Sequence, residues 1–149
     1  MRTKLRFAAQ IVLLTGFTLP LTITAQQLQR TLASTTAKFE SVSKSDTAWQ
    51  KALESHELDA AKKLIGHPGS FRGTVSKVYE SRDGDIVILD FDSNYRTALT
   101  AVLKKPDFSK FPDLQALEGK DIIVSGTFVD YQGKAEIALT MPDQIKLAR

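Results

Sequence analysis

Cationic side chains and tyrosines recur together in the C-terminal half of this 149-residue chain. Cations neutralise the phosphates of a nucleic acid, and exposed aromatic rings stack on its bases. Tyr95 stands beside Arg96, and Tyr131 is followed closely by Lys134. These residue types predict a site for an extended anionic ligand, with the contacts Arg72, Lys77, Tyr95, Arg96, Lys104, Tyr131 and Lys134.

Carboxylates occupy the same regions of the chain and oppose that chemistry, because each one weakens the electrostatic attraction of a polyanion. They are Asp83, Asp85, Asp90, Asp92 and Asp130. Under the alternative interpretation, the tyrosines cover turns and the lysines are solvated. The first four aspartates could also surround a calcium ion, but the EF-hand spacing with its distal glutamate is missing, and we expect no metal.

Candidate catalytic residues are few. His56 precedes Glu57, and His67 lies in a Gly-His-Pro-Gly segment, so neither histidine is paired with a recognisable nucleophile. The chain has no cysteine, which excludes thiolate chemistry and disulfides. Arg72, Arg96, Asp90 and Asp92 are the residue types that some nucleases use to hold a cation and stabilise phosphate charge, but the recognisable motif of such enzymes is missing. We therefore expect no enzymatic activity and no cofactor.

The N-terminus has the pattern of an export signal. Three basic residues precede an uncharged apolar run over residues 7–21, and Ala25 offers a small residue for cleavage. The run is shorter than the ~20 residues of a membrane-spanning helix, so we expect no stable membrane span after cleavage, although an uncleaved anchor is the alternative. Removing residues 1–25 would leave 17 basic and 17 acidic residues, so the basic excess belongs to the signal. We expect an exported protein, either periplasmic or secreted.

The composition fits a single globular domain, with 42% hydrophobic and 25% charged residues. Residues 26–45 are polar and predict a tether or weak helix. An apolar period close to 3.6 then predicts an amphipathic helix over residues 47–65, capped by Asp46 or Ser45 and ended by Gly66 and Pro68. Residues 26–69 are thus a tether and helix ahead of the main domain.

Trp49, the only tryptophan, lies on the apolar stripe of this predicted helix. It would either pack against the following domain as part of the core or contact another protein as an exposed anchor. We keep it as a candidate partner-binding residue.

From residue 70 onward the apolar period changes to two, which is typical of strands. Gly73 predicts a bend in the first strand, and Asp83-Gly84 predicts a hairpin turn. Asp90 and Asp92 are expected to face water. Pro106, Pro112 and Gly119 bracket a short helix between the third and fourth strands. The predicted strands cover residues 71–81, 86–92, 96–103, 120–130 and 134–140, and the helix covers 109–117.

This βββαββ order resembles the oligonucleotide/oligosaccharide-binding (OB) fold, a five-stranded Greek-key barrel. The segments that carry the resemblance to small bacterial exported barrels of the nucleic-acid-binding class are Val87–Phe91, Phe111–Leu114 with Leu117–Lys120, Val124–Gly126, and Tyr131–Lys134 through Pro142–Ile145. The resemblance covers residues 70 to about 147, within a barrel domain over residues 70–149, and implies a mainly β fold with helices. It also implies a binding face on the second and third strands, flanked by the first-second and fourth-fifth loops.

Two functions follow as hypotheses. The first is an exported, non-catalytic module that binds single-stranded nucleic acid or another extended anionic ligand across that face. The second is a cell-envelope adaptor that binds another protein through the Trp49 helix or an exposed barrel edge and has no nucleic-acid role.

Overall fold

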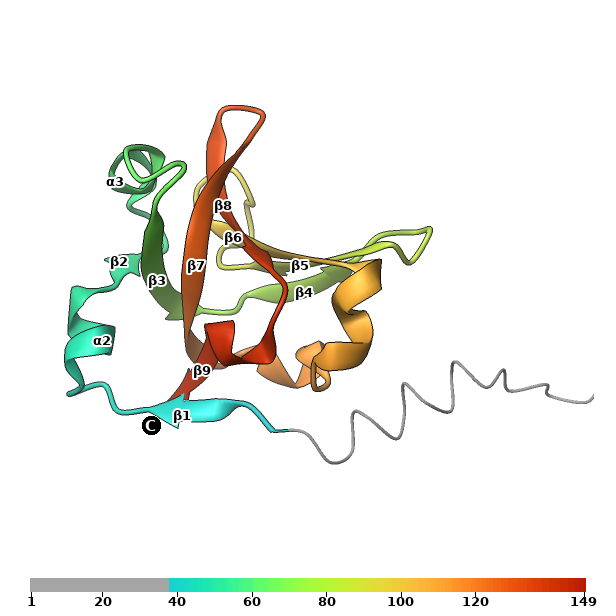
Figure 1. Cartoon of the computed structure of the whole chain (residues 1–149), viewed down its shortest axis with the longest axis horizontal. Coiled ribbons are helices and arrows are strands. Elements are labelled where there is room, and N and C mark those ends of the chain that lie inside the picture. The colour runs from blue at the N-terminus through green and yellow to red at the C-terminus, as the bar shows by residue number, and fades with distance from the viewer. Residues whose placement is uncertain (1–37) are drawn as a thin grey trace, which may run out of the picture.

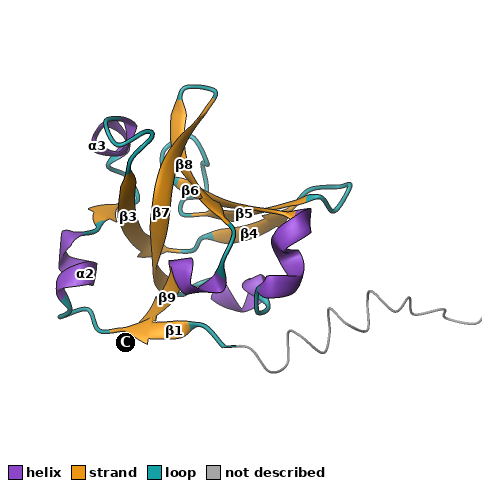
Figure 2. Cartoon of the chain, viewed as in Figure 1, coloured by secondary structure: helices purple, strands orange, loops and turns teal. Residues whose placement is uncertain are grey.

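The computed structural model describes residues 38–149, and this part of the chain is mainly β (Figures 1 and 2). It contains two short α-helices, α2 Thr47–Lys51 and α3 Leu58–Lys62, and three 3₁₀ helices, η1 Lys105–Lys110, η2 Leu114–Leu117 and η3 Pro142–Gln144. The strands are β1 Glu40–Val42, β2 Leu53–Glu54, β3 Pro68–Thr74, β4 Lys77–Glu80, β5 Ile86–Asp90, β6 Thr100–Lys104, β7 Asp121–Tyr131, β8 Lys134–Leu139 and β9 Ile145–Ala148.

Six strands form a curled sheet in the order β4-β5-β6-β8-β7-β3. Neighbours are antiparallel except β6 and β8, which run parallel. The two end strands of this path follow each other in the chain, separated by Val75 and Ser76. The amide of Val75 donates to Lys120 beside β7, and the amide of Ser76 donates to Asp90 on β5. The chain therefore crosses here from one wall to the other, which is consistent with an OB-like barrel.

The inward faces of these strands form the main core. Phe71, Leu89, Phe128 and Ile137 are fully buried there, and the Phe71 and Phe91 rings meet edge to face with centroids 4.9 Å apart. The core-facing residues predicted for 86–92 and 120–130 are confirmed, since Val87, Leu89 and Phe91 are buried in the main core, as are Ile122, Val124 and Phe128. Burial does not alternate strictly in the second segment, because Ile123 on the opposite face is buried in a second cluster with Trp49. The 83–84 turn is also confirmed, with Gly84 at φ +68°.

The number of strands differs from the five predicted. The predicted first strand is divided into β3 and β4 at Val75–Ser76, not bent at Gly73, which pairs regularly with Ile122 on β7. A Cβ at Gly73 would lie 2.8 Å from the Ser55 hydroxyl, so close packing and not a bend explains this glycine. Three short strands are additions: β1 pairs with β9, β9 with β7, and β2 with β3.

The predicted helix over 47–65 is wrong in its middle. It begins at Thr47 as expected, but α2 ends at Lys51 and α3 begins only at Leu58. Between them the amide of Ser55 donates to Arg72, and the Ser55 carbonyl accepts from Leu99. These hydrogen bonds to the barrel replace helical ones, because residues 54–57 are polar and leave a gap in the apolar stripe.

The predicted helix over 109–117 is also wrong, because two 3₁₀ helices, η1 and η2, occupy this region. Phe111 separates them in an extended conformation, at φ −96° and ψ 145°. The following residue, Pro112, disfavours the helical conformation of Phe111. Leu114 and Leu117 still point inward and are buried, so the three-residue apolar spacing reflects a 3₁₀ turn.

The N-terminal predictions fall partly outside the described residues. The export signal over 1–25 and most of the tether lie there. Residues 40–42, predicted as tether, form β1 and pair with the C-terminal strand β9. No helix within residues 38–149 is long and apolar enough to cross a membrane.

Candidate ligand-binding groove

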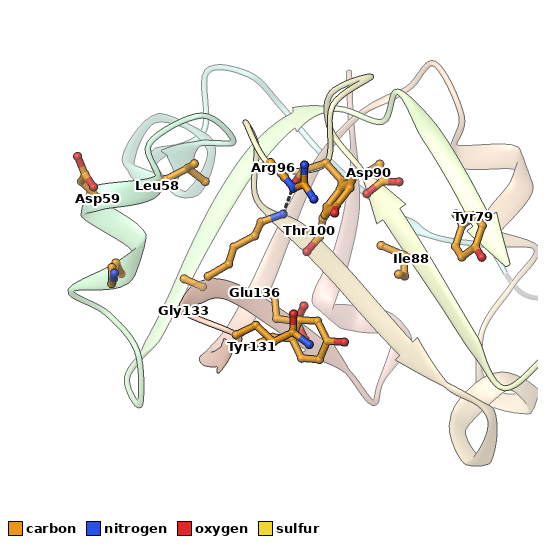
Figure 3. Close-up of a pocket in the computed structure, with 15 residues that line it drawn as sticks. Leu58, Asp59, Tyr79, Ile88, Asp90, Arg96, Thr100, Tyr131, Gly133 and Glu136 are labelled. Atoms are coloured by element: carbon orange, nitrogen blue, oxygen red, sulfur yellow. Dashed lines mark hydrogen bonds between the residues drawn. The ribbon is translucent and has the colours of Figure 1, made fainter. Parts of the chain in front are cut away.

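A groove of about 810 Å³ crosses the outer face of β5, β6 and β8. The β7–β8 hairpin, the β5–β6 loop and α3 form its rim, and Figure 3 shows the lining side chains around one hollow. Ala101 and Leu103 of β6 and the preceding Leu99 face the core, so Thr100 and Val102 face outward. Both are nevertheless buried, and Thr100 lines the groove, so part of the floor lies on β6. The lining residues are Leu58, Asp59, Lys62, Tyr79, Ile88, Asp90, Tyr95, Arg96, Thr100, Tyr131, Gln132, Gly133, Lys134, Ala135 and Glu136.

All three tyrosines of the chain line this groove. Tyr79 comes from β4, Tyr95 from the β5–β6 loop and Tyr131 from the end of β7. Their side chains are 44%, 54% and 58% exposed, respectively. Exposed aromatic rings gathered in one concave surface are typical of ligand-binding sites, where they supply apolar area at low conformational cost.

A row of polar side chains crosses the floor of the groove. Asp90 pairs with Thr100 in the sheet register, and Thr100 pairs with Glu136, so the row runs straight across β5, β6 and β8. Burial raises the pKa of Asp90 and also the pKa of Glu136, whose carboxylate accepts a hydrogen bond from Thr100. The Oδ1 atom of Asp90 is buried and has no hydrogen-bond partner in the described part of the chain. The expectation that Asp90 faces open water is therefore wrong.

Lys134 extends along the groove toward Tyr95. Its ammonium donates a hydrogen bond to the Tyr95 carbonyl, drawn as a dashed line in Figure 3, and lies 5.8 Å from the centroid of the Tyr95 ring. The guanidinium of Arg96 lies 5.2 Å from the same ring centroid. Burial lowers the pKa of Lys134, and the charges of Asp90 and Glu136 oppose this effect.

The loop that carries Tyr95 is held by Asp92. Its Oδ2 accepts hydrogen bonds from His56 Nε2 and Thr97 Oγ1, both at 3.0 Å, and its Oδ1 accepts from the amide of Asn94 at 3.2 Å. The hydrogen bond from His56 is the main cause of a strongly lowered pKa at Asp92. This carboxylate therefore positions the loop beside the groove.

The structure brings four predicted contacts together in the groove: Tyr95, Arg96, Tyr131 and Lys134. Lys77 and Lys104 are exposed at its margin. Lys77 pairs with Asp90 in the sheet register, and the charge of Lys104 acts on the pKa of Glu136. Neither side chain lines the groove.

Arg72 and Trp49 lie away from the groove. Arg72 donates to the Glu54 carboxylate at 2.6 Å and to the Trp49 carbonyl at 2.7 Å. Its guanidinium lies 5.4 Å from the centroid of the Trp49 ring. Trp49 is only 9% exposed and packs with Val42, Ala52 and Ile123, so it occupies a core position here.

Sequence reasoning missed several lining residues, including Tyr79, Thr100 and Glu136. The alternation of side chains along a strand could have predicted two of them, Tyr79 and Glu136. Tyr79 shares a face with Lys77 and Glu136 shares one with Lys134, because side chains two positions apart point the same way. Thr100 had no such signal, because its place on the floor depends on the pairing of β6 with β5 and β8.

Ser55, His56 and Asp92 form a chain of hydrogen bonds of the kind found in nucleophilic hydrolases. The Ser55 hydroxyl lies 3.3 Å from His56 Nδ1. However, Ser55 is only 3% exposed, so its hydroxyl is not accessible to a substrate. Among residues 38–149 there is no group of three or more His, Asp or Glu side chains that could hold a metal ion.

Comparisons with known proteins give one structural similarity. No protein-family model matches the chain, and no curated protein matches it. Among solved structures, the chain is similar to the aspartyl tRNA synthetase from Entamoeba histolytica, with a TM-score of 0.48 and 14% sequence identity. The similarity covers 74% of this chain and 26% of that chain, so this chain spans about a quarter of that protein.

Proposed function

We propose that this protein is an exported, non-catalytic OB-fold module that binds single-stranded nucleic acid in the groove. The observation that carries the proposal is the gathering of three exposed tyrosines, Tyr79, Tyr95 and Tyr131, in one hollow with Arg96 and Lys134. Each ring offers a face for a base, and the two cations can approach phosphates. The volume of about 810 Å³ suits a short segment of a strand.

The electrostatics predict weak binding. Three cations line the groove, Lys62, Arg96 and Lys134, against three carboxylates, Asp59, Asp90 and Glu136. If all three cations contacted phosphates, log K would change with log salt by a slope of about −2 for a single strand. We therefore expect most of the affinity to come from stacking.

A fluorescence-anisotropy titration tests this function. A labelled, mixed-sequence oligonucleotide should bind at about 25 mM salt and, if all three cations contact phosphates, about 40-fold more weakly at about 150 mM. The Lys120→Ala variant serves as a control because Lys120 is exposed and does not line the groove. No binding at low salt would exclude the nucleic-acid role.

The second candidate function is a cell-envelope adaptor that binds another protein. The groove favours this candidate to the extent that its cations and carboxylates are balanced, because a nucleic-acid site is usually strongly cationic. Burial of Trp49 removes the anchor first considered, which leaves the exposed edge of β1 and the groove as contact surfaces. An adaptor that uses apolar contacts would bind its protein partner with little salt dependence and would not bind oligonucleotides.

Export and the lack of catalysis are parts of the same proposal. The inaccessible Ser55 supports a non-catalytic role, and incubation with labelled DNA and RNA should leave both intact. The basic and apolar pattern of residues 1–25 supports export. N-terminal sequencing of the protein from a cell-envelope or culture fraction should begin at Gln26, and a chain starting at Met1 in the cytoplasm would contradict it.

A further inference from the structure

The carboxylates of the groove are placed for hydrogen bonding to a ligand. Glu136 lines the groove from β8, is half-buried, and accepts a hydrogen bond from Thr100. No salt bridge joins Lys134 to Glu136 or Asp90 in the described residues, because Lys134 is directed to the Tyr95 carbonyl. An ionised carboxylate only accepts hydrogen bonds and has room for several. Glu136 therefore retains acceptor capacity that a ligand can use.

The distribution of charge orients a bound strand. Asp90 on β5 and Glu136 on β8 flank β6 in the floor and repel phosphates, whereas Arg96 and Lys62 come from the loop and the helix at the rim. A strand in the groove would place its phosphates at this rim and the edges of its bases over the carboxylates. Tyr95 and Tyr131, also at the rim, would then stack on the faces of the bases.

We propose that the groove selects guanine, whose N1–H and N2 amino group both donate to the carboxylate of Glu136, with Thr100 holding that carboxylate in place. This inference rests on the proposed binding of single strands. Guanine alone among the four bases presents two adjacent donors that match the two oxygens of a carboxylate. Cytosine and adenine present one amino group, and thymine presents an N–H between two carbonyl oxygens that a carboxylate repels.

Asp90 strengthens the selection without contacting the base directly. The Oδ1 atom of Asp90 is buried, so this atom is not accessible to accept a hydrogen bond from a base. Its negative charge lies two strands from Glu136 and adds to the repulsion of thymine carbonyls. Bidentate contacts of this kind discriminate between bases by about 5- to 150-fold.

The test compares short thymidine oligonucleotides that differ only in the central base. The oligonucleotide with central guanosine should bind about tenfold more tightly than the all-thymidine one. Central inosine lacks the N2 amino group and should bind with intermediate affinity, whereas central 7-deazaguanosine keeps both donors and should match guanosine. Equal affinity for guanosine and thymidine would overturn guanine selection while leaving the proposed function intact. If neither oligonucleotide binds, the proposed function itself fails.

The Glu136→Gln variant locates the selection. A glutamine side chain keeps the shape but offers one acceptor, so the preference for guanosine should fall several-fold while binding of the all-thymidine oligonucleotide stays equal or improves. Asp143→Asn, an exposed carboxylate outside the groove, is the charge-matched control and should leave the preference unchanged. If Glu136→Gln changes affinity for both oligonucleotides by the same factor, Glu136 does not contact the base. Because the inosine comparison uses the unaltered protein, it decides the proposal even if the variant folds poorly.

Discussion

Removal of the Tyr131 ring is the most direct test of the groove. More than half of this side chain is exposed, at 58%, and no cation is stacked on it among the described residues. A base stacked on one ring contributes about 1–2 kcal/mol, so Tyr131→Ala should weaken oligonucleotide binding by about 5- to 30-fold. The salt dependence should stay the same, because no charge is removed.

Tyr95→Ala should behave differently, although its ring is similarly exposed. The ring also lies against Arg96 and Lys134, so its removal takes away a ring contact from both cations as well as a stacking surface, while Lys134 keeps its hydrogen bond to the backbone carbonyl. We expect a similar loss of affinity with an altered salt slope, and a loss of about 30-fold or more when both tyrosines are replaced.

The assay is the same anisotropy titration, with thermal melting to verify that each variant is folded. Tyr131→Phe keeps the ring and should retain nearly full affinity. Met141→Ala removes another exposed apolar side chain, 50% exposed and outside the groove, and should have no effect. If the double alanine variant binds within about twofold of the unaltered protein, stacking in this groove is refuted.

Three further outcomes follow from the same structure. Lys134→Ala should reduce the salt slope by about 0.7 to 1 and weaken binding, whereas an unchanged slope would show that this ammonium makes no phosphate contact. Glu136→Gln should raise the melting temperature near pH 7. Because the pKa of Glu136 is raised in the fold, its contribution to stability is present at low pH and is lost as the pH rises through that pKa. The increase in melting temperature should therefore shrink toward about pH 4. A gain that is independent of pH would point to packing instead. Gly73→Ala should destabilise the fold by about 1–3 kcal/mol, because its Cβ would meet Ser55 at 2.8 Å and Phe91 at 3.0 Å; an unchanged midpoint in urea would contradict the close packing.

The sequence predicted the barrel strands well because their signal is local. The period of two depends only on neighbouring residues, and the structure confirms the core-facing residues that it predicts in 86–90 and 121–131. The long helix failed because its apolar period spans a polar gap at Ser55, where hydrogen bonds to Arg72 and Leu99 decide the conformation. Those partners are distant in the chain, so no local pattern contains them.

The groove was predicted only in part, because some of its residues lie in local patterns and others are brought together by strand pairing. Tyr95 and Tyr131 lie next to turns, where exposure can be inferred from the sequence. The row through Thr100 requires the registers of two strand pairs, one of them the parallel pairing of β6 with β8. Arg72 is of a residue type that often contacts anionic ligands, which is why it was predicted as a contact. It instead forms an ion pair with Glu54 on strand β2, which the sequence did not predict.

The parallel pairing of β1 with β9 has a consequence for the order of folding. Glu40 lies opposite Lys146 and their side chains form a salt bridge at 2.8 Å, so the first described strand has its partner at the far end of the chain. During synthesis β1 cannot form its backbone hydrogen bonds until the final residues emerge, and closing so long a loop is slow. Both segments lie at the opposite end of the molecule from the β7–β8 hairpin (Figure 1). A dye or surface linker attached after Arg149 would therefore lie away from the hairpin that carries Tyr131.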